Sequence, residues 1–338
     1  MPIYSGLFDL VGNTPVVELR HGGGGDRGEV QLFAKLEGYN PTGSIKDRPA
    51  AYIIRKLLLD GEIDRDVTII ESSSGNFGVA LAAVCRTEGL RFICVVDPLI
   101  LPNNRFLIEQ YGAEVSEVTT RDDTGGYLKA RIARVKELEQ RIPRARWINQ
   151  YANPGNASAH YYGTGMEIYH AFSDVGLDYV LVPVSSGGTI TGISQLLKSL
   201  FPRITVIAVD TVGSVIFGGP PNPRYIPGMG SSIKPELLRT AMIDHVVMVS
   251  ERDIVSSCNE LLRRHGLFVG GSSGAAYRGA QQYFQDPAHL RSAQAPSYPR
   301  WRNGQRSRPR ALLIFPDRGD RYQSTIYDQR WVERTFVG

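Results

Sequence analysis

Short apolar runs alternate with amphipathic stretches along most of the chain. The apolar runs predict strands at residues 30–36, 67–70, 92–96, 114–118, 179–184, 204–209 and 311–315. Apolar positions at helical spacing predict helices at residues 44–61, 76–86, 104–111, 126–140, 159–172, 191–200, 254–265 and 274–284. Strands this short and apolar are typical of parallel sheets that helices cover on both faces. The pattern therefore predicts an α/β fold.

Length and charge narrow the class of protein. The 338 residues suffice for two domains, and 42% hydrophobic and 21% charged residues are ordinary for a globular protein. No apolar run is long enough to cross a bilayer. The net charge of +4 is small, and many arginines lie in residues 293–310, so we expect neither nucleic-acid nor membrane partners. We interpret segment 293–310 as a solvated insertion, with a basic binding loop as the alternative.

The cysteines and histidines argue against metal and disulfide chemistry. Cys85, Cys94 and Cys258 are odd in number and lack paired spacing, which disfavours a disulfide framework or a zinc site. None of the six histidines has the spacing of a metal ligand or a triad, so we interpret them as structural. The N-terminal residues do not form the pattern of a signal peptide. We therefore expect a cytoplasmic protein without a metal site.

One lysine stands at the start of a predicted helix. The turn formers of residues 40–43 precede this helix, and Ser44 and Asp47 are spaced like a capping box. Lys46 is then expected in the first turn, where the helix dipole disfavours an ammonium and favours the neutral amine that a Schiff base needs. The alternative is an ordinary exposed lysine after a loop.

Three further stretches are rich in Gly and Ser. Residues 71–78 read Glu-Ser-Ser-Ser-Gly-Asn-Phe-Gly, residues 185–189 read Ser-Ser-Gly-Gly-Thr, and residues 270–274 read Gly-Gly-Ser-Ser-Gly. A glycine-rich turn between a strand and a helix, such as 185–189, exposes backbone N–H groups and suits an anion. The alternative is a tight turn without a ligand. Because the lysine of a nucleotide loop is absent, we expect a cofactor phosphate.

In this order, the Lys46 segment and these three stretches resemble the fold-type II pyridoxal-phosphate enzymes, the cysteine synthase family of β-replacement enzymes. The resemblance extends from Val11 to Tyr322. It implies a tryptophan synthase β-like fold of two three-layer αβα domains with mostly parallel sheets. The N-terminal domain would span residues 40–154, and residues 13–39 and 155–325 would form the larger domain with the phosphate loop. It also implies pyridoxal 5'-phosphate as cofactor and a homodimer.

The resemblance implies a role for each cofactor residue. Lys46 matches the lysine that holds the cofactor covalently and, once released, acts as the base on the substrate Cα. Asn76 matches the residue that bonds the cofactor's 3-oxygen. The phosphate cup matches Ser185, Ser186, Gly187, Gly188 and Thr189. Ser272 matches the hydroxyl at the pyridine nitrogen, where it gives a weaker electron sink than a carboxylate and favours β-elimination; a helix N-cap is its alternative.

The substrate residues follow in the same way. The carboxylate cradle of the family matches Ser73, Ser74, Gly75 and Gln150. A narrower resemblance, carried by residues 147–153, 213–218 and 316–322, implies that L-glutamate replaces the phosphate of O-phospho-L-serine, towards 2,3-diaminopropionate and siderophores. Two glutamate carboxylates require cationic or hydroxyl partners, and the candidates are Arg131, Tyr151 and Ser185. Arg131 could instead be a snorkelling arginine, and Tyr151 a satisfied core aromatic.

Several alternatives remain open. Phe77 stands where cysteine synthases usually have Thr, which disfavours sulfide as the nucleophile, yet a cysteine synthase using O-acetylserine or O-phosphoserine is the main alternative function. A threonine or serine dehydratase and a non-catalytic cofactor-binding relative are two others. Asp317 and Arg318 follow the last strand, where α/β sheets place ligands. They are either a surface ion pair or part of the cofactor's ring pocket.

Overall fold

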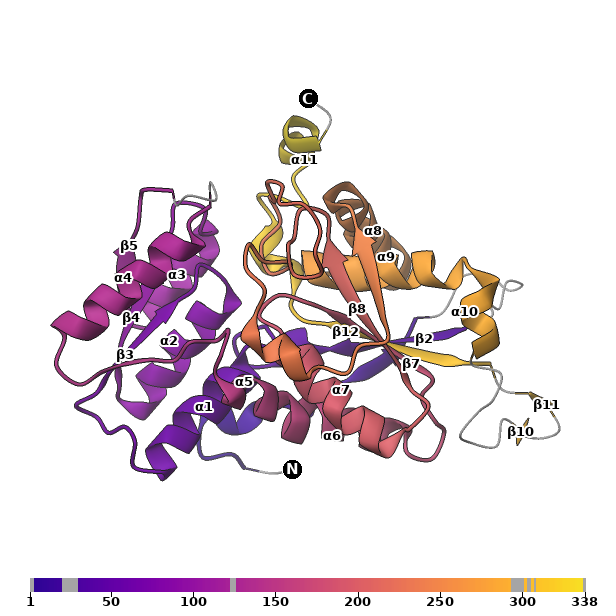
Figure 1. Ribbon diagram of the computed structural model, residues 1–338, viewed down its shortest axis with the longest axis horizontal. Helices are drawn as coiled ribbons and strands as arrows, with labels where there is room; N and C mark the ends of the chain where they lie inside the picture. The colour runs from indigo at the N-terminus through magenta and orange to yellow at the C-terminus, as the bar shows by residue number, and fades with distance from the viewer. Residues whose placement is uncertain are drawn as a thin grey trace.

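The computed structural model describes residues 3–19, 30–121, 126–292, 301–302, 305–306 and 308–336. Its strands form a four-stranded sheet, in the order β5-β4-β3-β6, and a six-stranded sheet, in the order β1-β2-β12-β7-β8-β9. The two sheets lie side by side, and α1 (Asp47–Leu59) packs against α5 (Pro154–Ala159) between the two halves (Figure 1). Most of segment 293–310 lies outside the described residues, so its interpretation stays a prediction. In the described part of the chain, no helix is both long and apolar enough to span a membrane.

The four-stranded sheet is parallel and buried on both faces. Its strands are β3 (Thr68–Ser72), β4 (Arg91–Val96), β5 (Glu114–Glu117) and β6 (Ala145–Trp147). Its helices are α2 (Asn76–Glu88), α3 (Pro102–Gln110) and α4 (Leu128–Arg141). Ile69 and Phe92 pack in one core with α1 and α2, whereas Ile70 and Ile93 pack in another with α4. Because side chains alternate along a strand, a strand buried on both faces reads as one continuous apolar run.

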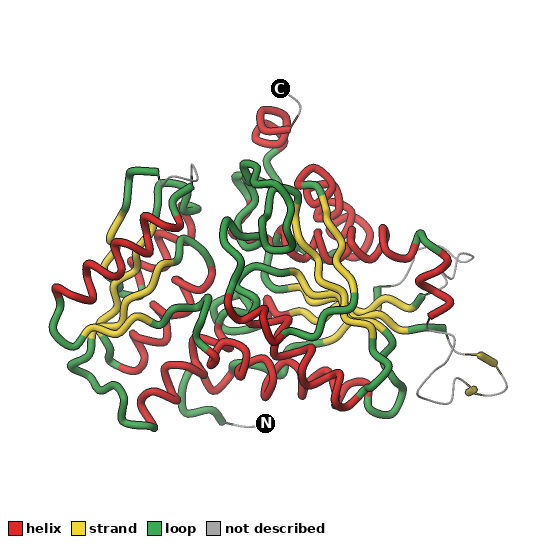
Figure 2. The backbone as a smooth tube through the Cα atoms, in the orientation of Figure 1, coloured by secondary structure: helices red, strands yellow, loops and turns green. Residues whose placement is uncertain are grey.

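The six-stranded sheet is also covered by helices on both faces (Figure 2). Its strands are β1 (Val16–Glu18), β2 (Gln31–Leu36), β7 (Tyr179–Pro183), β8 (Thr205–Thr211), β9 (His245–Val249) and β12 (Arg310–Phe315). β1 pairs antiparallel with β2, and the other described pairs in this sheet are parallel. α8 (Glu251–His265) and α9 (Gly271–Phe284) cover Tyr179 and Leu181, and α6 (Met166–Phe172) and α7 (Gly188–Leu200) cover Val180 and Val182. The predicted αβα layers and mostly parallel sheets are confirmed.

Smaller elements complete the described chain. The remaining helices are α10 (Pro287–Ser292) and α11 (Gln329–Phe336), and a two-stranded ribbon joins β10 (Trp301–Arg302) to β11 (Gln305–Arg306). Short 3₁₀ turns are η1 (Leu7–Leu10), η2 (Glu37–Tyr39), η4 (Glu236–Thr240) and η5 (Gly319–Tyr322). α11 projects from the body of the molecule near the C-terminus (Figure 1).

The predicted boundaries differ from the structure mainly at glycines. α7 begins at Gly188 and α9 at Gly271, three residues before the predicted starts in each case. Ser272 is therefore the second residue of α9, and its interpretation as an N-cap is wrong. Sequence reasoning placed the starts late because glycine disfavours a helix, but close packing requires glycine here: a Cβ on Gly271 would stand 2.4 Å from Cγ2 of Ile226. β9 was missed because it lies at a sheet edge with much of its length exposed.

The predicted capping box before α1 is wrong. Oδ2 of Asp47 accepts from the backbone N–H of Thr42 over 2.6 Å, and Oγ of Ser44 accepts from the N–H of Lys46 over 3.3 Å. The two side chains therefore brace the preceding turn and do not bond each other's backbone. Helix α1 begins at Asp47, so Lys46 stands immediately before its first turn.

Candidate active site

Three segments that are distant in sequence meet at Asp317, two residues after the end of β12. The Lys46 segment reaches it through a β-bridge between Ser44 and Asp317. Asn76, the first residue of α2, donates from Nδ2 to Oδ2 of Asp317 over 2.7 Å. Oγ of Ser272 lies 3.5 Å from Oδ1 of the same carboxylate. This junction lies after the carboxyl ends of parallel strands, where open α/β sheets bind ligands.

Lys46 has the properties of a nucleophilic amine. Its side chain is partly buried, and its amine bonds no described residue. Burial lowers its pKa to about 8, and the nearby charge of Asp317 opposes the shift. A substantial share of the amine is therefore neutral near pH 8. The pKa is lowered as predicted, but the cause is burial and not the helix dipole, since Lys46 stands before the first turn of α1.

The turn of residues 185–189 joins β7 to α7 and fits a phosphate group. The first N–H groups of α7 have no acceptor within the helix. Gly187 has a φ of +86°, and a Cβ on Gly188 would stand 2.1 Å from Oδ1 of Asn156, so both positions require glycine. Oγ of Ser186 accepts from Nδ2 of Asn156 over 3.2 Å, which leaves its own hydrogen for an anion. These donors and the bare backbone are what a phosphate site requires.

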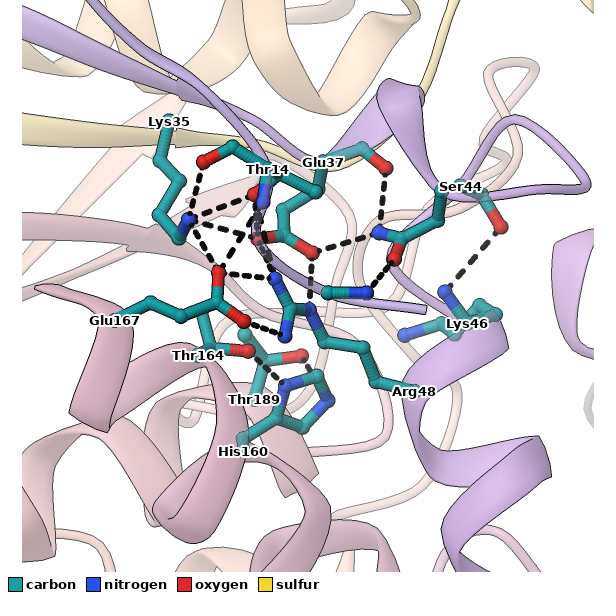
Figure 3. A network of polar contacts seen from close by, with 12 residues as sticks. Thr14, Lys35, Glu37, Ser44, Lys46, Arg48, His160, Thr164, Glu167 and Thr189 are labelled. Carbon is teal, nitrogen blue, oxygen red and sulfur yellow. Dashed lines mark hydrogen bonds and ion pairs between the residues drawn. The ribbon is translucent and has the colours of Figure 1, made fainter. Parts of the chain in front are cut away.

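A buried histidine supports this turn from behind (Figure 3). Nε2 of His160 lies 3.2 Å from Oγ1 of Thr189, and its Nδ1 lies 2.9 Å from Oγ1 of Thr164. Burial lowers the pKa of His160 well below its ordinary value, so the ring is neutral. His160 opens a π-helical turn, His160–Gly165, of a kind that is frequent at functional sites. Sequence reasoning missed this contact because no local spacing relates His160 to the turn.

Next to this histidine lies a buried network of two acids and two bases (Figure 3). Arg48 donates from Nε to Glu37 over 2.5 Å and from Nη1 to Glu167 over 2.6 Å. Nζ of Lys35 lies 2.7 Å from Oε2 of Glu167. Burial alone would raise the pKa of Glu167, but Arg48 and Lys35 hold it at about 2. The network ties β2 and α6 to α1, the helix that follows Lys46.

The segment after β12 holds Asn76 from two sides. Arg321 donates from Nη1 to Oδ1 of Asn76, while Asp317 accepts from its Nδ2. Asp317 is 2% exposed and forms no ion pair with a described residue. Arg318 is exposed and pairs with Asp320 over 2.8 Å. The interpretation of Asp317 and Arg318 as a surface ion pair is therefore wrong, because their side chains point to different surroundings.

The start of α2 presents unused backbone donors. Oγ of Ser73 accepts from the N–H groups of Gly75 and Gly78 over 3.3 and 3.0 Å and so fixes the turn. The backbone N–H of Ser74 donates to no described residue. Gln150 lies at the same strand end, where its side-chain amide donates to the backbone of β3 over 3.2 Å. A helix N-terminus with free N–H groups suits a carboxylate.

Arg131 reaches these residues from α4. Its Nη1 donates to Oγ of Ser74 over 2.8 Å and lies 3.2 Å from Oδ2 of Asp97. The side chain is 12% exposed, and its buried Nε has no hydrogen-bond partner among the described residues. The interpretation as a snorkelling arginine is therefore wrong. Asp97 was not anticipated, since nothing in the sequence relates it to Arg131.

Tyr151 and Ser185 lie near a second arginine. Burial raises the pKa of Tyr151, and the charges of Arg131 and Arg224 oppose this shift. Tyr151 is partly buried, and its hydroxyl has no hydrogen-bond partner in the described part of the chain, so it is not a satisfied core aromatic. Ser185 donates to the carbonyl oxygen of Gly230 over 3.2 Å, and a Cβ on Gly230 would stand 2.7 Å from Nη1 of Arg224. Sequence reasoning missed Arg224, which lies unmarked in a long loop.

Two further buried residues bear on the cradle. Glu71 accepts from the backbone N–H of Gln150 over 3.1 Å, and burial raises the pKa of Glu71 to about 7. Phe77 is 2% exposed and packs in the core with α1 and α2. Phe77 therefore gives no argument about the second-substrate pocket. Among the described residues, no group of three or more metal-ligating side chains occurs.

Comparison with known proteins identifies the family. Residues 7–293 match a family model described as pyridoxal-phosphate dependent enzyme. Curated relatives from Ralstonia nicotianae and Cupriavidus metallidurans are 44% and 42% identical over 333 residues, which is 98% of this chain and 92% of each relative. Both are named N-(2-amino-2-carboxyethyl)-L-glutamate synthase.

Solved structures agree over nearly the whole chain. An O-acetylserine dependent cystathionine beta-synthase from Helicobacter pylori has a TM-score of 0.84 at 32% identity, covering 97% of this chain and 100% of that one. An O-ureido-L-serine synthase has a TM-score of 0.83 at 27% identity, covering 99% of this chain and 96% of that one. The chain therefore belongs to the pyridoxal-phosphate dependent enzymes of fold type II, with pyridoxal 5'-phosphate as its cofactor.

Proposed function

We propose that this enzyme catalyses β-replacement, in which the amine of L-glutamate replaces the phosphate of O-phospho-L-serine to give N-(2-amino-2-carboxyethyl)-L-glutamate. The observation that carries this proposal is the agreement of two relatives of that name, at 44% and 42% identity, along 98% of the chain. The placement of Arg131 against Ser74 supports it, because an anionic amino acid requires a cation close to the reacting centre.

The donors described above support the following cofactor contacts. When bound, pyridoxal phosphate supplies a conjugated ring that accepts the electron pair left at the substrate Cα. Lys46 would hold the cofactor and, once released, would take the Cα proton. The first N–H groups of α7 and the residues of the turn, Ser185, Ser186, Gly187, Gly188 and Thr189, would hold its phosphate. Asn76 would donate to the 3-oxygen, and Ser272 would face the ring nitrogen.

The first substrate binds at the start of α2. Its carboxylate accepts from the free backbone N–H of Ser74, and Ser73 keeps the turn in place by accepting from the N–H of Gly75. Gln150 closes the other side. With the carboxylate fixed, the Cα–H bond is presented to Lys46, and loss of that proton expels phosphate from Cβ.

The second substrate is bound by the residues around Tyr151. The guanidinium of Arg131 and the unpartnered hydroxyl of Tyr151 offer donors to one glutamate carboxylate. Arg224 and Ser185, which both lie beside Gly230, suit the second carboxylate. The glutamate amine then attacks Cβ and loses a proton to solvent as the new C–N bond forms, and Lys46 returns a proton to Cα.

The experiment uses purified holoenzyme with O-phospho-L-serine and ¹⁵N-labelled glutamate. We expect phosphate release to depend on glutamate and to match, one for one, a product that carries the label. Cysteine formed with added sulfide at a higher rate would support the alternative, a cysteine synthase. Pyruvate formed without glutamate would indicate a dehydratase, and no phosphate release with any nucleophile would indicate a non-catalytic relative.

The cellular setting is part of the proposal. We infer a cytoplasmic homodimer that serves 2,3-diaminopropionate and siderophore biosynthesis. Three cysteines that are free and buried suit a reducing compartment. We also infer that residues 40–154 form one domain and that residues 13–39 and 155–325 form the other, since the two sheets divide along these lines.

A further inference from the structure

Asn156 is a buried side chain that contacts two parts of the candidate site at once. It lies in the first turn of α5 and is 2% exposed. Its Nδ2 lies 2.8 Å from the backbone carbonyl oxygen of Gln150 and 3.2 Å from Oγ of Ser186. Gln150 belongs to the proposed carboxylate cradle, and Ser186 belongs to the phosphate turn. One amide group therefore joins the cradle to the turn.

The carbonyl group of Gln150 fixes the direction of both hydrogen bonds. A carbonyl oxygen only accepts, so the Asn156 atom that faces it is the amide nitrogen. An amide nitrogen only donates, so Oγ of Ser186 accepts from its second hydrogen. The hydroxyl hydrogen of Ser186 then points away from Asn156 and is available to an anion at the turn.

The oxygen of the same amide has no such partners. Oδ1 of Asn156 is buried and accepts no hydrogen bond from the described residues, which destabilises a fold. It also fills the space beside Gly188, where a Cβ would stand 2.1 Å from it, so the first residue of α7 has to be glycine. A nonpolar side chain of the same shape would avoid the unpartnered oxygen. The amide is therefore better explained by its two donated bonds than by stability.

Gln150 is held at both of its backbone polar groups. Its N–H donates to Glu71 over 3.1 Å, and its carbonyl oxygen accepts from Asn156. The side-chain amide of Gln150 donates to the carbonyl oxygen of Ser72 over 3.2 Å. Without the Asn156 amide, one side of this backbone would be free to move, and the Gln150 side chain would move with it.

We propose that Asn156 is a positioning residue that couples the carboxylate cradle to the phosphate turn. At the turn, it directs the Ser186 hydroxyl towards the cofactor phosphate. At the cradle, it fixes the backbone of Gln150 beside the substrate carboxylate. The link crosses the boundary that we infer between the two domains. This inference rests on the proposed placement of the cofactor phosphate at Ser186 and of the substrate carboxylate at Gln150.

The experiment measures cofactor and substrate affinity in Asn156→Leu. Leucine has nearly the shape of asparagine, but it cannot donate a hydrogen bond, and it removes the unpartnered oxygen. We expect the Kd of pyridoxal phosphate for the apoenzyme, measured by fluorescence titration, to rise about tenfold, because a hydrogen bond to a charged group is weakened. At saturating cofactor, the KM for O-phospho-L-serine should rise while kcat changes much less. A Kd and a KM equal to those of the wild type would overturn the proposal.

Ser186→Ala tests whether Asn156 acts on the cofactor through Ser186. If it does, Asn156→Leu should raise the Kd by less than about twofold in the Ser186→Ala background, because changes along one chain of contacts do not add. Two increases that multiply in full would overturn the proposal. A wild-type Kd in Ser186→Ala alone would overturn it together with the placement of the phosphate.

Asn153→Leu is the matched control. Asn153 is the N-cap of the same helix, and its side-chain amide bonds the backbone of Ile148 and Gly155 over 2.9 Å each. Loss of this cap should lower the melting temperature of the apoenzyme and leave the Kd of the cofactor unchanged. The opposite pattern is expected for Asn156→Leu. If Asn156→Leu lowers only the melting temperature, Asn156 is merely structural and the proposal is wrong.

Asn156→Asp decides if Asn156→Leu does not fold. The aspartate carboxylate keeps the shape but accepts the hydrogen of Ser186, which withdraws it from the phosphate, so the Kd of the cofactor should again rise. A wild-type Kd in this variant would contradict the proposal. Phosphate release from O-phospho-L-serine by the wild type is measured on the same preparation. Failure of the proposed reaction is then seen separately, because the cofactor Kd does not depend on the substrate.

Discussion

Replacing Glu167 by Gln tests the buried ion network beside the phosphate turn. The Glu167 side chain is 19% exposed and pairs with Arg48 over 2.6 Å and with Lys35 over 2.7 Å. Gln keeps the shape but removes the charge, and the remaining carboxylate for Lys35 is then Glu37, 3.7 Å away. Breaking a buried ion pair costs about 3–5 kcal/mol, because the abandoned charge stays buried. We expect the free energy of unfolding to fall by about this much at pH 7.

The pKa of Glu167 gives a second value for the stabilisation by this carboxylate and the pH range over which the stabilisation is lost. The carboxyl has a pKa of about 2 in the folded protein against an ordinary value of 4.5. At about 1.36 kcal/mol per pKa unit, this difference corresponds to about 3 kcal/mol. Because the folded pKa is depressed, this stabilisation is complete above pH 4.5 and is lost as pH falls towards 2. The difference between wild type and Glu167→Gln should therefore shrink across that window.

Urea unfolding of the holoenzyme, at several pH values and fixed cofactor concentration, measures both effects. The control is Glu137→Gln on α4, where the glutamate is 45% exposed and pairs with Arg134 and Arg141 on the surface. We expect that control to leave the free energy of unfolding nearly unchanged, because solvent screens its ion pairs. A loss below about 1 kcal/mol in Glu167→Gln at pH 7, or a loss that does not vary with pH, would refute the reasoning.

Three further predictions concern the site. The apoenzyme should capture cofactor faster as pH rises through about 8, the pKa of Lys46, and Asp317→Asn should lower this midpoint because Asp317 favours the ammonium. Stopped-flow absorbance measures both effects. A capture rate that does not depend on pH would contradict the role of Lys46. Arg131→Met should lower kcat/KM for glutamate by about 10–100-fold, since a charged hydrogen bond contributes about 1.5–3 kcal/mol. An equal loss of kcat/KM when sulfide is the nucleophile would mean that Arg131 binds phosphoserine. Tyr151→Phe should raise the KM for glutamate and leave the melting temperature unchanged, because the Tyr151 hydroxyl bonds no residue that the structure describes. A clear drop in melting temperature would instead show that the hydroxyl stabilises the fold.

Local pattern was enough to predict most of the fold. The apolar runs became β3, β4, β7, β8 and β12, because strands buried on both faces leave no place for polar side chains. The helical spacing over residues 126–140 predicted α4, and Val135 and Leu138 of this helix lie in the core. The pattern did not predict β9, because most of this edge strand is exposed and shows no clear apolar run. It also placed the starts of α7 and α9 too late, because both helices begin with glycine.

The site was predictable only where it coincides with a turn or a helix start. The Lys46 segment and the turn at 185–189 can be recognised in the sequence, because their backbone conformations require Gly, Pro and Ser at fixed positions. Asp97 and Arg224 were missed, since each acts through a neighbour far away in the chain. The contact of His160 with Thr189 was missed for the same reason, because only the packing of α5 and the π-turn against α7 brings the two side chains together.

The sequence by itself therefore determined the alternation of strands and helices, the glycine-rich turns and the family, since each of these depends on residues that are close in the chain. Only the tertiary structure decided which charges are buried together and which donor faces which acceptor. Asp317 shows the difference: the sequence placed it after a strand, and the fold enclosed it among Asn76, Ser272 and Tyr322. Burial and hydrogen-bond direction depend on all the elements that pack around a group, and no single stretch of sequence contains them.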